Sequence, residues 1–321
     1  MERITKTKWL WKLFLENNAK SMTGKNEKGI GLYLLYGATY LMAMLPFRML
    51  YILSDILYVV VYYLAGYRRK VVRKNLLRSF PRKKEEEILQ IEKKFYRHLC
   101  DYFVETVKTL RISEKEIRKR MVFKNPEIVN RLTKDGNICL LSLGHYGNWE
   151  WVPSIALHLL PGVEPGQVYK TLKSKAFDEL FLKIRSRFNP LSIEMKTAYR
   201  TIIRKRNEGQ AMVIGFLTDQ RPRKHNNECW ATFLNQDTLL QTGMERIARQ
   251  LGLAVVYLDI KKVERGHYVG NFSVITADAS AEEEFTVTEK YTRKLEETIL
   301  NDPAYYLWSH NKWSRSKKQE A

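Results

Sequence analysis

Apolar positions along the chain fall into short continuous runs and longer periodic segments, which together predict strands and helices. The runs at 138–143 and 212–217 are rich in Leu, Ile and Val and end in polar or turn residues, as buried strands do. Further strands are expected at 167–170, 254–260 and 269–276, the last as the hairpin partner of the one before it. Apolar residues at three- and four-residue steps predict helices at 85–120, 176–188, 200–206, 242–251 and 285–300. This alternation predicts an α/β fold with a mainly parallel central sheet flanked by helices.

The stretch from Ile30 to Gly66 is almost uniformly apolar, with only Arg48 and Asp55 charged. A membrane-spanning helix needs about 20 apolar residues, and Pro46 divides the stretch into two pieces near or below that length. One span with an interfacial helix and a re-entrant hairpin both fit. A buried hairpin in a soluble domain is the alternative, which the Tyr-rich edges and basic flanks disfavour.

These patterns divide the chain into a basic extension (1–29), a membrane-anchoring helical segment (30–67) and a catalytic domain (68–321). The larger basic cluster follows the apolar stretch directly, at 68–78. By the positive-inside rule, the domain after it is expected on the cytoplasmic side of the membrane.

The turn after the strand at 138–143 holds the candidate chemistry. His145 lies in that turn and Glu150 at the start of the next helix, so the carboxylate is expected to reach the imidazole. A neutral imidazole oriented by a carboxylate takes a proton from an attacking hydroxyl, which makes His145 a general base and Glu150 its orienter. The alternative is a structural histidine and a helix-capping acid. Gly144 and Gly147 are expected to let a substrate approach the backbone, whose N–H groups are candidate oxyanion donors.

Charge and cysteine content narrow the function classes. The chain has 55 Lys and Arg against 35 Asp and Glu, a net charge of +20, which attracts nucleic acid, anionic lipid headgroups or an acidic carrier protein. Its three cysteines are widely spaced and form no C-x-x-C pair, so neither a disulfide framework nor a zinc site is indicated. No phosphate-binding loop motif is present, and we expect neither a metal nor a cofactor. No helix-turn-helix or zinc finger is visible, so a nucleic-acid partner is not expected.

Several motifs occur in one order along the chain. They are Tyr67-Arg-Arg-Lys-Val-Val-Arg-Lys-Asn-Leu, Ser79-Phe-Pro81, His145 to Glu150, Asp219-Gln220, Phe233-Leu-Asn followed by Thr242-Gly243, and Trp308-x-His310-x-x-Trp313-x-Arg315. From about residue 30 to the end, this order resembles the late acyltransferases of lipid A biosynthesis, in the lysophospholipid acyltransferase superfamily. Asn189 and Asn235 depart from it, because many members of that family have Gly there.

The resemblance implies a glycerolipid acyltransferase-like fold and an O-acyltransferase of the bacterial inner membrane. The reaction implied is transfer of a fatty acyl chain from acyl carrier protein to a hydroxyl of a Kdo-linked lipid A precursor, a step in lipopolysaccharide biosynthesis. The nearest rival is an enzyme of the same fold that acts on another lysolipid or aminolipid. A non-catalytic, membrane-attached polyanion-binding protein is a more distant one.

By the same resemblance, His145 and Glu150 inherit the catalytic roles. The expected substrate-binding residues are Lys170, Arg185, Arg187, Asp219 and Gln220. Arginine and lysine suit phosphates and carboxylates of the acceptor, and Asp219 suits an acceptor hydroxyl or a neighbouring cation. Taken singly, the cations are equally typical of solvated helix ends, and Asp219 of a turn after a strand.

Overall fold

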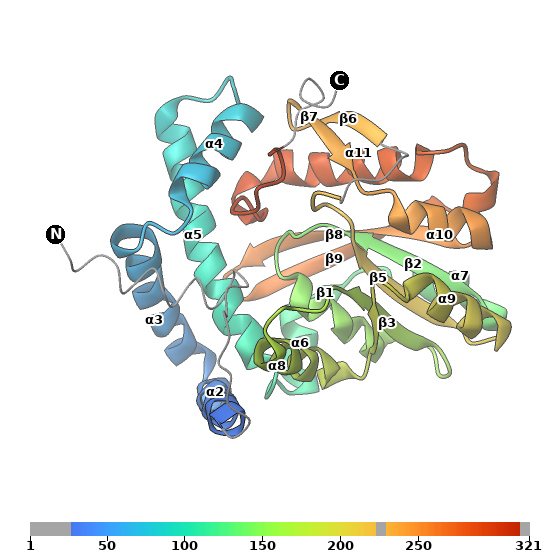
Figure 1. Cartoon of the computed structure of the whole chain (residues 1–321), viewed down its shortest axis with the longest axis horizontal. Coiled ribbons are helices and arrows are strands. Elements are labelled where there is room, and N and C mark those ends of the chain that lie inside the picture. Colours follow the sequence, from blue (N-terminus) through green and yellow to red (C-terminus); the bar gives the residue numbers. More distant parts are fainter. Residues whose placement is uncertain (1–26, 223–228, 315–321) are drawn as a thin grey trace.

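A computed structural model describes residues 27–222 and 229–314, and a seven-stranded sheet forms its centre (Figure 1). The strand order is β1-β9-β8-β2-β5-β3-β4, and β6 and β7 form a separate antiparallel hairpin. The strands are β1 (Met121–Phe123), β2 (Ile138–Leu143), β3 (Glu164–Tyr169), β4 (Leu191–Glu194), β5 (Met212–Leu217), β6 (Cys229–Phe233), β7 (Gln236–Leu240), β8 (Ala254–Glu264) and β9 (His267–Thr276). Every pairing in the large sheet is parallel except that of β8 with β9. The predicted mainly parallel sheet is confirmed, and so is the predicted hairpin, which is formed by β8 and β9.

Helices cover this sheet and extend to one side of it (Figure 1). The α-helices are α2 (Glu27–Met44), α3 (Phe47–Tyr58), α4 (Arg69–Ser79), α5 (Glu85–Lys108), α6 (Glu114–Arg120), α7 (Glu127–Leu132), α8 (Lys175–Arg185), α9 (Ala198–Asn207), α10 (Gly243–Leu251) and α11 (Thr286–Asn301). A π-helical turn, η1 (Val59–Leu64), continues α3, and the 3₁₀ segments are η2 (Lys134–Gly136), η3 (Trp149–His158), η4 (Ser186–Phe188), η5 (Ala279–Ala281) and η6 (Pro303–Tyr305). The predicted helices are all present, with 85–120 divided into α5 and α6.

Strand β2 is buried at all of its positions. It lies between β5 and β8, and helices cover both faces of the sheet, so no position on β2 faces water. A strand enclosed in this way needs a continuous apolar run rather than alternation, which is the pattern at 138–143.

The apolar stretch near the N-terminus forms α2, α3 and η1, divided at Pro46 as predicted. Helix α3 packs on α5, which separates it from the sheet (Figure 1). Its inner face buries Leu50, Ser54 and Tyr58. The segment Phe47–Leu64 is long and apolar enough to cross a membrane by length and composition, and only 28% of it is buried.

Its outer face is apolar and exposed. The exposed large side chains at helical spacing are Met49, Ile52, Ile56, Val59 and Tyr63. A helix that is apolar on both sides, with one side open, has the composition of a membrane-contacting helix rather than of a solvated one.

The chain after α11 returns across the carboxyl ends of the central strands. Trp308 is fully buried there and packs against Phe80 and Trp313. The Asn75 side-chain amide on α4 donates to the main-chain oxygens of Trp308 (2.9 Å) and His310 (3.0 Å), which fastens this C-terminal tail (303–314) to α4. The two tryptophans are packing residues.

Asn75→Ala should loosen the C-terminal tail. It leaves two main-chain oxygens without their donor, so the free energy of unfolding should fall by about 1–3 kcal/mol. The matched control is Asn301→Ala at the exposed end of α11, which should stay within about 0.5 kcal/mol of the original protein. Denaturant unfolding in detergent measures both, and equal effects would contradict the role given to Asn75.

Candidate active site

The register of two neighbouring strands brings the site together. Strands β2 and β5 are parallel, and their last paired residues are Leu143 and Leu217. His145 and Asp219 each lie two residues further along. Parallel strands end at the same edge of a sheet, where such folds place their ligand sites, so the two side chains meet.

His145 and Asp219 form a close pair. The imidazole Nδ1 lies 2.6 Å from Asp219 Oδ1, and the His145 main-chain N–H donates to Oδ2 over 3.1 Å. Burial opposes ionisation of Asp219, but the charge and hydrogen bonds of His145 and the charge of Lys312 outweigh it and hold the pKa of this carboxyl below its usual range. An ionised Asp219 accepts the Nδ1 proton, which leaves the lone pair of the neutral ring on Nε2.

Gln220 caps that lone pair. Its Nε2 lies 3.1 Å from His145 Nε2, and the amide is the donor when the ring carries its proton on Nδ1. The Trp149 ring lies edge-on to the imidazole, with 5.1 Å between centroids. The Nε2 lone pair of His145 is therefore hydrogen-bonded to the Gln220 amide, and the ring is held on both of its nitrogens.

Glu150 was expected to contact the imidazole, but the carboxylate bonded to it is that of Asp219. Both Glu150 oxygens accept from Arg185, over 2.9 Å from Nε and 2.6 Å from Nη2. Burial lowers the pKa of Arg185, but the charge and hydrogen bonds of Glu150 outweigh it and raise that pKa above its usual range. The expected contact is corrected because η3 carries Glu150 toward α8, where a buried carboxylate finds a bidentate cation.

The other expected binding residues lie in different surroundings. Arg187 donates from Nε and Nη2 to the main-chain oxygen of Ile112, and so fastens η4 to the connection between α5 and α6. Lys170 is exposed directly after β3. Their substrate-binding roles stay predictions, as do those of Arg185 and Gln220.

The two glycines of the turn face the protein interior. A Cβ on Gly144 would lie 2.5 Å from Leu295 Cδ1, and one on Gly147 would lie 2.9 Å from Ile260 Cγ2. Gly147 also has a φ of +61°, which L side chains rarely adopt. Tight packing of the turn, rather than substrate approach, accounts for both glycines.

The main-chain N–H groups of this turn are also engaged. Those of His145, Tyr146 and Gly147 donate to Asp219, to the Gly144 main-chain oxygen and to the Tyr305 main-chain oxygen. These three groups fix the turn, and the expectation that they serve as oxyanion donors is not met in this arrangement.

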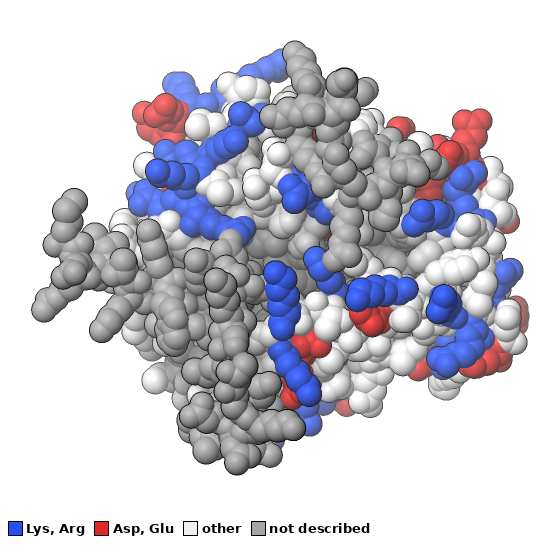
Figure 2. Space-filling view, viewed as in Figure 1, with Lys and Arg blue, Asp and Glu red and all other residues white. Residues whose placement is uncertain are grey.

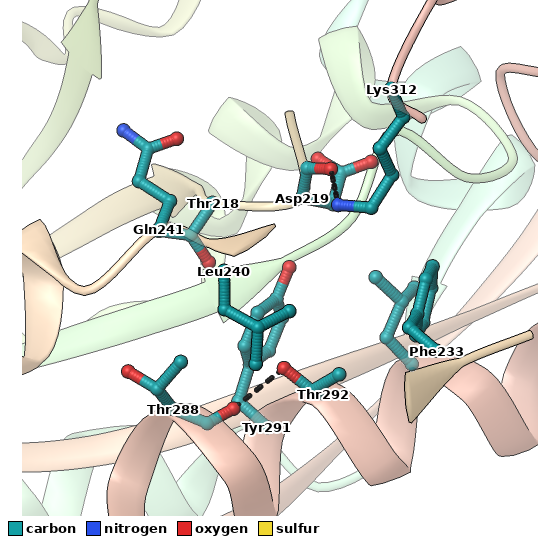
Figure 3. A pocket seen from close by; sticks show the side chains of 10 residues that line it. Thr218, Asp219, Phe233, Leu240, Gln241, Thr288, Tyr291, Thr292 and Lys312 are labelled. Atoms are coloured by element: carbon teal, nitrogen blue, oxygen red, sulfur yellow. Dashed lines mark hydrogen bonds between the residues drawn. The ribbon is translucent and has the colours of Figure 1, made fainter. Parts of the chain in front are cut away.

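Lys312, which the sequence did not single out, lies over Asp219. Its buried amine donates to the Asp219 main-chain oxygen at a small pocket between the end of β5 and α11 (Figure 3). Burial lowers the pKa of Lys312 to about 8, against the opposing charge of Asp219. Burial likewise lowers the pKa of His310, in the same C-terminal tail, to about 4. The flanking tryptophans were visible in the sequence, but a lysine in so basic a tail carries no signal of its own.

A comparison with protein-family models matches residues 23–315, nearly the whole chain, to the family described as bacterial lipid A biosynthesis acyltransferase. A search of the curated proteins finds no match. In residues 27–222 and 229–314, no group of three or more His, Cys, Asp or Glu side chains is placed to hold a metal ion.

The buried Lys312 predicts a rise of stability with pH. Its pKa is about 8 in the folded protein, below the 10.5 of an exposed lysine. Between these two values the unfolded chain binds a proton that the folded protein has released, so the free energy of unfolding should increase with pH. The slope from one proton is at most about 1.4 kcal/mol per pH unit.

Unfolding curves of the original protein and of Lys312→Met, measured from pH 7 to 11, test this expectation. Between pH 7 and 11, the free energy of unfolding of the original protein should rise relative to that of Lys312→Met. Lys261→Met, at an exposed lysine of β8, should leave the pH dependence unchanged. Parallel curves for the original protein and Lys312→Met would show that the buried amine does not titrate in this range.

Proposed function

Because the chain belongs to the bacterial lipid A biosynthesis acyltransferase family, we propose that it transfers a fatty acyl chain from acyl carrier protein to a hydroxyl group of a Kdo-linked lipid A precursor. The observation that carries the proposal is the His145–Asp219 pair, which presents a basic Nε2 at the carboxyl edge of the sheet. A hydroxyl acceptor needs such a base, and a thioester donor supplies a good leaving group.

In the proposed reaction, the acceptor hydroxyl displaces the Gln220 amide from His145 Nε2. The ring takes the hydroxyl proton as the oxygen attacks the thioester carbonyl, and the Asp219 carboxylate stabilises the imidazolium that forms. The tetrahedral intermediate then expels the carrier thiolate, which receives the proton from Nε2. One ester forms and one thioester breaks, and the base is regenerated.

Glu150 keeps a part in this proposal, as an anchor of the turn. Its bidentate bond to Arg185 joins the start of η3 to α8, so the turn that begins at His145 is held at both ends. A buried cation left without its carboxylate is strongly unfavourable, so loss of Glu150 would move the turn.

Exposed cations on α4 support an acidic donor and an anionic acceptor. Figure 2 shows Lys and Arg side chains gathered over this helix. Lys70, Lys74 and Arg78 are its exposed members, and Lys170 is exposed directly after β3. Acyl carrier protein and the phosphates and carboxylates of the acceptor all carry negative charge, which such a surface attracts.

Membrane attachment fits the same proposal. The family is membrane-associated, and the exposed apolar face of α3 is suited to lipid. The basic segment that follows η1 favours the cytoplasmic face of the inner membrane, where acyl carrier protein is found.

The first test is of the catalytic pair. His145→Ala should lower the rate of acyl transfer by about 10²- to 10⁴-fold, because general-base catalysis is lost. Asp219→Asn should also be severe, since the imidazolium loses its counter-charge. The double variant should be little slower than His145→Ala, because residues that act as one unit are not additive.

The assay is mass spectrometry of the acylated acceptor, with acyl carrier protein as the donor and a Kdo-linked precursor, a lysophospholipid and an aminolipid as competing acceptors. His267→Ala, on β9, is the matched control and should retain full activity. Near-normal transfer by His145→Ala would refute the assigned base, and preference for another acceptor would refute the proposed substrate.

The second test is of membrane attachment. Ile52 and Ile56 are 55% and 57% exposed on α3. The double variant Ile52→Lys/Ile56→Lys should release most of the protein from vesicles, because burying either charge in lipid is unfavourable. Leu300→Lys, at a residue 52% exposed on α11, is the control and should remain bound. Flotation with vesicles gives the bound fraction, and equal binding of all variants would show that α3 does not face lipid.

A further inference from the structure

Glu105 on α5 is a buried carboxylate that no step of the proposed reaction uses. Its side chain is fully buried, and three donors surround it. Asn148 Nδ2 and the Tyr268 hydroxyl each donate to Oε2 over 2.8 Å, and the Tyr51 hydroxyl donates to Oε1 over 3.1 Å. Burial raises the pKa of Glu105, and a buried carboxyl group needs hydrogen-bond partners whichever form it takes, so Glu105 fixes the groups that satisfy it.

One side of this cluster is the catalytic turn. Asn148 is fully buried and lies between His145 and the first residue of η3, Trp149, whose ring contacts the imidazole. The main-chain oxygen of Glu105 also accepts from Trp151 Nε1 over 3.3 Å. Glu105 therefore holds the turn at two residues, through its carboxylate and through its main chain.

The other side of the cluster is the helix with the exposed apolar face. Tyr51 lies on α3, between the exposed residues Met49 and Ile52. A single carboxylate thus joins the helix proposed to contact lipid to the turn that carries the base. The link is a continuous chain of hydrogen bonds, Tyr51 to Glu105 to Asn148.

We propose that Glu105 is a positioning residue for acyl transfer. Through its hydrogen bond with Tyr51, the position of the His145 turn depends on how α3 packs against α5. The inference rests on the proposed function, and it assigns Glu105 no contact with substrate. Loss of Glu105 should lower kcat, because a misplaced base slows the chemical step. KM should change little, because the exposed cations on α4 remain intact.

The chain contains a matched control for this link. Tyr62, on η1, donates to Glu92 of α5 over 3.1 Å, the same type of bond at the same distance as that of Tyr51 with Glu105. Glu92 is also fully buried, but its other partners are Arg69 and Arg73 of α4. Tyr62→Phe therefore removes an equivalent hydrogen bond, but one that connects to α4 instead of to the His145 turn.

The experiment measures kcat, KM for the acceptor, and the rate at which diethyl pyrocarbonate modifies His145, read by peptide mass spectrometry. Tyr51→Phe should lower kcat by about fivefold, with KM nearly unchanged, and should alter the modification rate of His145. Tyr62→Phe should lower thermal stability as much as Tyr51→Phe does and leave both readouts of the site unchanged.

Glu105→Met removes both carboxylate acceptors at nearly constant volume and should lower kcat by about 100-fold. Glu105→Gln keeps an oxygen for Asn148 and Tyr268 and should restore most of that loss. Combining Tyr51→Phe with Glu105→Met should add nothing to Glu105→Met, because both act through one network. If Glu105→Met does not fold, the inference is tested by comparing kcat and the His145 modification rate of Tyr51→Phe with those of Tyr62→Phe.

Equal effects of Tyr51→Phe and Tyr62→Phe on kcat and on His145 modification would overturn the inference. Absence of acyl transfer by the original protein would refute the proposed function instead. The modification rates would in that case still decide whether Tyr51 and Glu105 set the position of His145.

Discussion

The bond between His145 and Asp219 is the interaction on which the rest of the site depends. Asp219 is 4% exposed, and a carboxylate at such a place stays ionised only when donors and a nearby cation compensate for lost solvation. The main chain and ring of His145 supply the donors, and Lys312 supplies the cation. His145, the end of β5 and the C-terminal tail are therefore linked, since none of the three can move without leaving a buried charge unpaired.

How far the sequence predicts this arrangement depends on how local each signal is. Strands β2 and β5 were predicted at 138–143 and 212–217, because an enclosed parallel strand needs a continuous apolar run. The edge strands β1 and β4 and the β6–β7 hairpin were not predicted, since each is short and only partly buried. His145 was identified because its turn directly follows a recognisable strand.

The partner of His145 could not be predicted in the same way. Glu150 is close in sequence, but a 3₁₀ segment with Pro153 inside it directs this carboxylate to Arg185. Asp219 is distant in sequence and becomes the neighbour only through the register of β2 against β5. Lys312 depends on tertiary structure still more, because its place is set by the return of the C-terminal tail. The sequence thus singled out the histidine and both carboxylates, and the topology of the sheet decides which carboxylate contacts the imidazole.

Helix α5 shows why the apolar N-terminal segment and the catalytic turn are not independent parts. It carries three buried acids, and each has its own set of partners. Glu92 accepts from Tyr62 and pairs with α4, Asp101 accepts from Ser54 and pairs with Lys262 and Arg265, and Glu105 accepts from Asn148 and two tyrosines. Buried ion pairs add little net stability compared with apolar packing of the same volume. The buried acids instead restrict orientation, because each acid accepts hydrogen bonds only from donors that approach its oxygens in the right geometry. An apolar α5 could still pack against α3, but it would leave the rotation of α3 and the path of the turn unspecified. The acids on α5 fix both, so the exposed apolar face of α3 and the His145 turn are held in a defined arrangement on opposite sides of α5.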